Sequence, residues 1–142
     1  MSELEGESKN EGMKTSRDAF KYCNEKNLDC IYPMANELFV DIDTEADYGN
    51  FLKNKNIISI IKAWHVTPSR TKAQGKHIVV ELDRDVTSIE RIALQTILGS
   101  DTRREAHSWV RLQANDPLPT LFFEKKKKKI VEEPYPSINS QE

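Results

Sequence analysis

Several features that would identify a class of protein are scarce in this sequence. Among its 142 residues there are two cysteines and five glycines, and the formal net charge at pH 7 is −2. Cys23 and Cys30 are too few for the disulfide framework of a small secreted domain or for a zinc site of their own, so they are expected to be reduced thiols. A charge so close to zero excludes a general attraction of the whole chain to nucleic acid, although local basic clusters can still bind it.

Long hydrophobic runs are also missing. No apolar run approaches the roughly 20 residues that a membrane-spanning helix needs. The opening segment, MSELEGESKNEG, is acidic and polar and does not resemble a signal peptide. The sequence therefore predicts a cytoplasmic protein with no membrane partner.

The overall composition fits one folded domain with polar terminal segments. Hydrophobic residues make up 37% of the chain and charged residues 31%, which fits a modest core under a heavily charged surface. Residues 1–14 and 126–142 have few apolar side chains and are predicted to be disordered, the second following on from a run of lysines. A single domain is predicted over residues 15–125.

Hydrophobic periodicity predicts both helices and strands. Strands are predicted at 37–43, 57–66, 77–82 and 120–124, and helices at 16–26, at 44–54, from the Asp85–Glu90 segment to Gly99, and at 101–113. From residue 37 onward the order is strand, helix, strand, strand, helix, strand. This is the ferredoxin-like or RRM-like βαββαβ plan, an α+β fold with an antiparallel sheet and its helices on one face. It makes the strands at 37–43 and 77–82 central neighbours and puts 120–124 beside 37–43.

An acidic pair ends the first of these strands. Alternate residues of a strand point to the same face, so Asp41 and Asp43 should converge while Val40 and Ile42 face a core. Two neighbouring carboxylates repel each other, and Mg²⁺ commonly binds one or two carboxylates together with substrate phosphates. The pair thus indicates a metal site, the alternative being that Asp43 or Thr44 only caps the next helix.

A histidine is expected beside the acidic pair. His77 opens the strand at 77–82, which the βαββαβ plan makes a neighbour of the acidic strand. An imidazole in that position could bind or orient the phosphates of a nucleotide. The alternative is a structural histidine at the start of a buried strand.

The loop before His77 is rich in cations. Arg70, Lys72 and Lys76 lie within seven residues, and Gly75 allows a close approach of the backbone to a ligand. This pattern is typical of a loop that faces phosphates. A solvated hairpin turn is the simpler interpretation.

Three further charged residues are candidates for the same site. Glu124 ends the strand at 120–124 and could supply a third acidic ligand, although Lys125 follows it and an ordinary surface ion pair is the alternative. Arg104 and Arg111 are seven residues apart, on one face of the predicted helix, where they could contact phosphates. An exposed helix with several ion pairs would explain the same spacing.

Together these motifs resemble the catalytic core of the archaeo-eukaryotic primase superfamily. The similar segments are Phe39–Asp43 (an hhDhD motif), Gly75–Val80 (a histidine motif), the strand that ends at Glu124, and Leu98–Asp101 followed by Arg111. The last of them is similar to the segment after the histidine in phage and plasmid primase-polymerases. The resemblance covers roughly residues 36–125. The chain departs from the family's pattern in having Glu124 where Asp is usual and in lacking a serine near the histidine.

The resemblance implies a function and roles for individual residues. Asp41, Asp43 and Glu124 would hold Mg²⁺ or Mn²⁺, and His77 would contact the phosphates of the incoming nucleotide. The implied activity is that of a DNA-directed primase or polymerase-like nucleotidyltransferase in nucleic-acid replication. Its partners would be a nucleoside triphosphate, single-stranded DNA or a primer-template, and replication proteins.

Two alternatives share the fold. The first is a reduced phage or plasmid form, catalytically inactive, that binds nucleic acid or acts as an accessory or interaction protein in replication. The second is an ordinary RRM, which reads single-stranded RNA by stacking bases on sheet aromatics. The strand at 77–82 carries no aromatic residue, which disfavours the second alternative.

Overall fold

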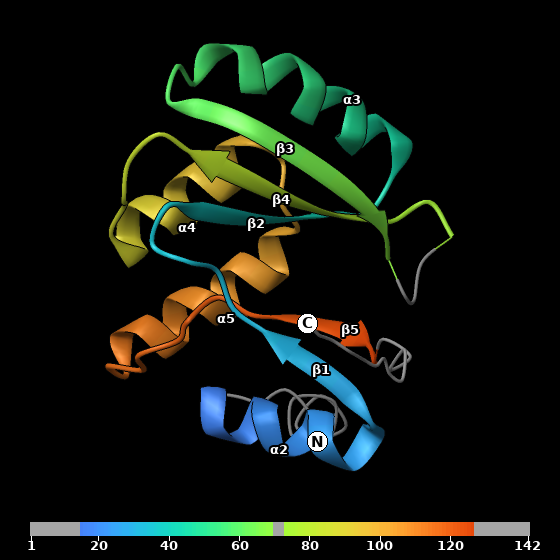
Figure 1. Ribbon diagram of the computed structural model, residues 1–142, viewed down its shortest axis with the longest axis vertical. Coiled ribbons are helices and arrows are strands. Elements are labelled where there is room, and N and C mark those ends of the chain that lie inside the picture. The colour runs from blue at the N-terminus through green and yellow to red at the C-terminus, as the bar shows by residue number, and fades with distance from the viewer. Residues whose placement is uncertain (1–14, 70–72, 127–142) are drawn as a thin grey trace, which may run out of the picture.

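In the computed structural model, the described residues, 15–69 and 73–126, form two antiparallel sheets and four α-helices (Figure 1). The strands are β1 (Leu28–Ile31), β2 (Glu37–Ile42), β3 (Ile61–Pro68), β4 (Lys76–Leu82) and β5 (Phe122–Lys125). The helices are α2 (Ser16–Lys26), α3 (Glu45–Asn54), α4 (Ser88–Ile97) and α5 (Thr102–Gln113), with a 3-10 turn, η1, at Lys55–Ile57. The predicted α+β class is confirmed. Apart from Lys126, the segments predicted to be disordered lie outside the described residues.

Each α-helix begins after a residue that caps it. The side chains of the four N-cap residues accept a hydrogen bond from a backbone N–H of the first turn. These residues are Thr15, Thr44, Thr87 and Asp101. At α4 the cap is reciprocal, because Glu90 also accepts from the backbone N–H of Thr87. Polar caps of this kind explain why three of the helices begin within one residue of the predicted position.

The larger sheet has the order β2-β4-β3. Its register sets Asp41 of β2 and Thr67 of β3 opposite His77 of β4, on either side of it. The predicted pairing of the acidic strand with the histidine strand is therefore confirmed, as is the hairpin between β3 and β4. β3 begins at Ile61, later than predicted, because the preceding segment includes the turn η1.

The last strand pairs differently from the prediction. β5 was expected beside β2, but it pairs with β1, which was not predicted at all. These two strands and α2 lie below the larger sheet in the view of Figure 1. The four residues of β1 are all half-buried, so they lack the alternation that identifies a strand from sequence.

Side chains occupy the edge of β2 where a fourth strand was expected. Three alternate residues, Glu37, Phe39 and Asp41, direct backbone groups toward this edge. The atoms that satisfy these groups come from α4, α5 and the turn between them: Arg91 Nε (2.8 Å to Glu37 O), Gln95 Oε1 (2.8 Å to Phe39 N), Arg104 Nη1 (3.3 Å to Phe39 O), Ser100 Oγ (2.9 Å to Asp41 N) and Asp101 N (2.8 Å to Asp41 O). Because buried backbone groups need partners, this edge has no need of another strand.

The hydrophobic core lies on one face of the larger sheet. It contains Leu38, Val40, Ile42, Phe51, Ile78, Val80, Leu82 and Leu98, none more than 1% exposed. Phe51 comes from α3 and Leu98 follows α4, so both helices cover the same face. The residues that alternate with them on β2 and β4, including Asp41 and His77, point to the opposite face.

Candidate metal and nucleotide site

Three aspartates meet at the end of β2. Asp41 lies on β2, Asp43 directly follows this strand, and Asp101 directly precedes α5. One carboxylate oxygen from each of the three aspartates can be chosen so that the three oxygens lie within 4.8 Å of one another. The predicted acidic pair therefore has a third member that the sequence interpretation did not assign to it.

The backbone of the turn before α5 brings Asp101 to this place. Gly99 has a φ of +92°, which favours glycine, and it turns the chain back toward β2. Ser100 Oγ and Asp101 N then bind the backbone N–H and C=O of Asp41, at 2.9 and 2.8 Å. The side chain of Asp101 caps α5 by accepting from Arg103 N at 3.1 Å. The sequence signal for this residue was its position as a helix cap directly after a glycine turn.

The electrostatics of the aspartates favour a cation. Burial raises the pKa of Asp41, and the nearby carboxylates of Asp43 and Asp101 raise it further, while Arg104 and His77 act in the opposite direction. Three carboxylate oxygens form a hard donor set of the kind that Mg²⁺ and Mn²⁺ prefer. The residues present therefore fit a divalent ion chemically.

His77 lies directly beside Asp41 and is held by three neighbours. Its Nε2 is 3.6 Å from Asp41 Oδ1, and its Nδ1 is 2.5 Å from Glu124 Oε2. Its ring stacks on Phe122 with centroids 4.0 Å apart, and Phe122 also stacks on Phe39 at 4.5 Å. The imidazole is thus fixed both in its plane and at Nδ1.

Glu124 does not belong to the group of three aspartates. It was predicted as a third metal ligand; its carboxylate lies against His77 Nδ1, and the aspartate that is grouped with Asp41 and Asp43 is Asp101. The reason is that β5 pairs with β1 and not with β2. Glu124 is thereby directed across the face of the larger sheet, toward the histidine.

The two arginines predicted to contact nucleic acid are internal. Arg104 donates to the carbonyl oxygen of Leu121 through Nη2 at 2.6 Å and lies over the ring of Phe122 at 4.3 Å. Arg111 is 7% exposed and donates to Pro119 O through Nε at 2.8 Å. The seven-residue spacing did put both on one helical face, but that face is turned inward. This corrects the prediction that they face phosphates.

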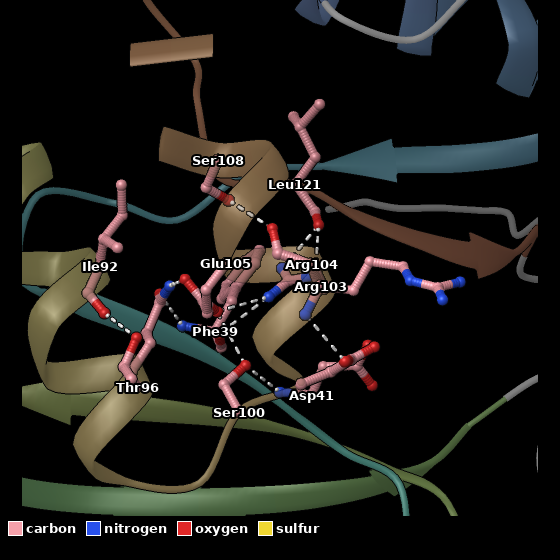
Figure 2. Close-up of polar contacts among 12 residues, drawn as sticks. Phe39, Asp41, Ile92, Thr96, Ser100, Arg103, Arg104, Glu105, Ser108 and Leu121 are labelled. Atoms are coloured by element: carbon pink, nitrogen blue, oxygen red, sulfur yellow. Dashed lines mark hydrogen bonds and ion pairs between the residues drawn. The ribbon is translucent and has the colours of Figure 1, made fainter. Parts of the chain in front are cut away.

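A buried carboxylate connects these groups. Glu105 is 4% exposed and accepts from Ser100 Oγ at 2.8 Å and from Arg104 Nη1 at 3.1 Å (Figure 2). It also accepts from Gln95 Nε2 at 2.8 Å. Burial raises its pKa, and these three partners oppose the rise. The same three side chains bind the backbone of β2, so Glu105 fixes the strand that carries Asp41. Sequence reasoning missed this residue.

One of the three cations predicted in the basic loop, Lys76, lies within the described residues. Lys76 Nζ lies 2.8 Å from Glu45 Oε2 and 4.9 Å from the ring centroid of Tyr48, both on α3. Adjacent residues of a strand alternate between faces, so Lys76 points away from the face that carries His77. Arg70 and Lys72, the other two predicted cations, lie outside the described residues.

Comparison with known proteins gives no relative. No family model, no curated protein and no solved structure matches the chain. Among the described helices there is none with the length and apolar character to cross a membrane. A function for this chain must therefore be argued from the chemistry of the site.

Proposed function

We propose that this chain is a divalent-metal-dependent nucleotidyltransferase of the primase-polymerase kind, acting in nucleic-acid replication. The observation that carries the proposal is the meeting of Asp41, Asp43 and Asp101, with oxygens within 4.8 Å of one another, beside His77 on one sheet face. The proposed substrates are a nucleoside triphosphate and a primer-template or single-stranded DNA. The resemblance to primases adds to this argument through Asp41, Asp43 and His77.

The aspartates are the proposed ligands of Mg²⁺ or Mn²⁺. A bound ion would neutralise charge on the transferring phosphoryl group and would favour the deprotonated 3′-hydroxyl. Such an ion would stabilise the charged form of Asp41, whose pKa is raised by burial and by two neighbouring acids. Glu124 as an additional ligand rests on the family resemblance alone.

The residues of the chain would orient the reactants. In the transfer, the 3′ oxygen forms a bond to the α-phosphorus, the bond from that phosphorus to the β-phosphate oxygen breaks, and pyrophosphate leaves. His77, held against Phe122 with its Nε2 directed toward Asp41, is the proposed contact for the triphosphate. Positioning of this kind supplies a large share of the rate enhancement of phosphoryl transfer.

A catalytically inactive nucleic-acid-binding or accessory protein is the second candidate. The observation that favours it is that Arg104 and Arg111 are internal, which removes two of the expected contacts to a substrate backbone. RNA recognition by base stacking is not a third candidate. Phe39, the aromatic residue of β2 on this face, is 3% exposed beneath Phe122.

Primer synthesis and primer extension with Mg²⁺ or Mn²⁺ test the proposal. The wild type should make product, and Asp41→Asn and Asp43→Asn should not. Asp85→Asn is the matched control, since Asp85 is exposed and lies in the loop after β4. Product formation by Asp41→Asn at the wild-type rate would exclude the proposed chemistry. Metal-independent DNA binding without any product from the wild type would favour the accessory role.

A further inference from the structure

We propose that Glu124 is a positioning residue: its carboxylate accepts a hydrogen bond from Nδ1 of His77, which sets the neutral ring in the tautomer with hydrogen on Nδ1 and directs Nε2 toward the aspartates. The part of this inference that concerns the nucleotide rests on the proposed function. The part that concerns the tautomer does not, and it can be measured in the free protein.

The two nitrogens of His77 have unequal partners. Nδ1 lies 2.5 Å from Glu124 Oε2, a short charge-assisted hydrogen bond, whereas Nε2 is 3.6 Å from Asp41 Oδ1, beyond hydrogen-bond range. The hydrogen bond at one ring nitrogen decides which nitrogen carries the hydrogen. Because a carboxylate can only accept, Glu124 keeps the hydrogen on Nδ1.

The strand that carries Glu124 holds the ring in two ways. Phe122 and Glu124 are two residues apart on β5 and point to the same face. Phe122 stacks on the imidazole at 4.0 Å and Glu124 binds its Nδ1, so one strand fixes both the plane of the ring and its rotation within that plane. β5 is itself held by pairing with β1, where Glu124 lies opposite Asp29. The small sheet therefore supports the site on the larger one.

The two possible roles of Glu124, as a metal ligand or as a positioning residue, predict different effects of its substitution. A ligand would act on the ion directly, so its loss would change the metal concentration that half-saturates activity. A positioning residue acts through His77, so its loss should matter only while His77 is present. Glutamine, which keeps an oxygen acceptor but loses the charge, should replace Glu124 well in the second role and poorly in the first.

Nitrogen-15 NMR of the His77 ring, recorded over a pH series that includes the neutral imidazole, tests the tautomer. The wild type and Glu124→Gln should carry hydrogen on Nδ1, and Glu124→Ala should shift the population toward hydrogen on Nε2. Glu81→Ala is the matched control, because Glu81 lies on β4 on the same face, paired with Lys62 at 3.7 Å. An unchanged Nδ1 tautomer in a folded Glu124→Ala protein would overturn the inference.

A kinetic cycle tests the link to the nucleotide. The phosphate oxygens can only accept, so His77 contacts them through Nε2–H as an imidazolium, with Glu124 still bound to Nδ1. Glu124→Ala should raise KM for the nucleoside triphosphate by about tenfold, the value of one charge-assisted hydrogen bond, with little change in the metal dependence. The same substitution in a His77→Ala background should have no further effect. Additive effects, or a shifted metal half-saturation, would assign Glu124 to the ion and contradict us. Should the wild type make no product, the proposed function fails while the NMR result still decides the tautomer.

Discussion

The two faces of the β2-β4-β3 sheet are made by alternate residues of the same strands but differ in composition and burial. On one face Leu38, Val40 and Ile42 are fully buried under α3 and α4. On the other, the Asp41 side chain stays 19% exposed, with His77 beside it. The first face is stabilised by apolar burial, while the second gathers like charges that destabilise one another. Substitutions should therefore separate stability from function according to the face they alter.

A network of polar side chains lines the edge of β2, between the two faces. Gln95, Ser100 and Arg104 bind its backbone and are joined by the buried carboxylate of Glu105. A polar network of this kind is rigid when every member has a partner and costly when one is missing. It belongs to neither face, and its loss should affect both.

The largest expected effect is on the core face. Phe51→Ala should lower the free energy of unfolding by about 3 to 5 kcal/mol, because the ring is fully buried and packs against Trp64 at 5.3 Å. Urea denaturation followed by circular dichroism measures it. Leu52→Ala, at a neighbouring side chain that is 36% exposed, is the control and should cost much less. Equal losses for the two variants would show that the core is not where we place it.

On the site face the effect should fall on activity. Asp41→Asn should reduce nucleotide incorporation at least about 100-fold, through the loss of a ligand to the ion. Its stability at neutral pH should equal or exceed that of the wild type, because a buried charge that repels Asp43 and Asp101 is removed. Single-turnover incorporation and urea denaturation on the same samples give both numbers. A stability loss like that of Phe51→Ala would contradict the division between the faces.

At the edge of β2 both properties should change together. Glu105→Ala should cost about 1 to 3 kcal/mol of stability, because the polar groups of Gln95 and Ser100 lose their buried partner. The backbone amides of Phe39 and Asp41 should also exchange faster with deuterium. Glu25→Ala, on the exposed side of α2, is the control and should change neither measurement. If the deuterium exchange of these amides is unchanged in Glu105→Ala, the network does not hold β2 in place.

The smallest effect is expected outside both faces. Burial alone would raise the pKa of Asp116, but hydrogen bonds from Ser16 and Leu118 outweigh it and lower the pKa. Asp116 therefore contributes stability that is complete above its ordinary value of 3.8 and is lost as the pH falls through the lowered pKa. Solvent screening limits the contribution to below about 1 kcal/mol.

The test of that pH dependence is Asp116→Asn. Compared with the wild type by thermal unfolding, the variant should be slightly less stable at pH 7 and indistinguishable near pH 2. Incorporation activity should stay at the wild-type level, since α2 and the loop after α5 belong to neither face. A difference that grows toward acid pH would reverse the sign we assign to Asp116.

Local patterns in the sequence predicted much of the fold, and long-range pairing limited the rest. The bounds of α2 and the pairing of β2 with β4 follow from periodicity, caps and the order of elements. The position of β5 could not be predicted, because its partner β1 has four half-buried residues and no alternation. Nothing local to Phe122–Lys125 indicates whether that strand pairs with β1 or with β2.

The site was predictable where it depends on register and not where it depends on buried polar groups. Asp41 and His77 were expected together because the order of strands makes them neighbours. Glu105 and Arg104 have side chains that normally face solvent, and hydropathy gives no sign that they lie inward here. Asp101 carried a signal as a helix cap, but a cap alone does not reveal which strand it approaches.

The most direct test of the central claim is the binding of Mn²⁺ followed by NMR. Substoichiometric Mn²⁺ should broaden the amide signals near Asp41, Asp43 and Asp101 before any others in the wild type and in Asp85→Asn. Asp101→Asn keeps an N-cap side chain for α5, so it should fold normally and lose most of that broadening. Broadening that persists unchanged in Asp101→Asn, or that never centres on the end of β2, would contradict the account.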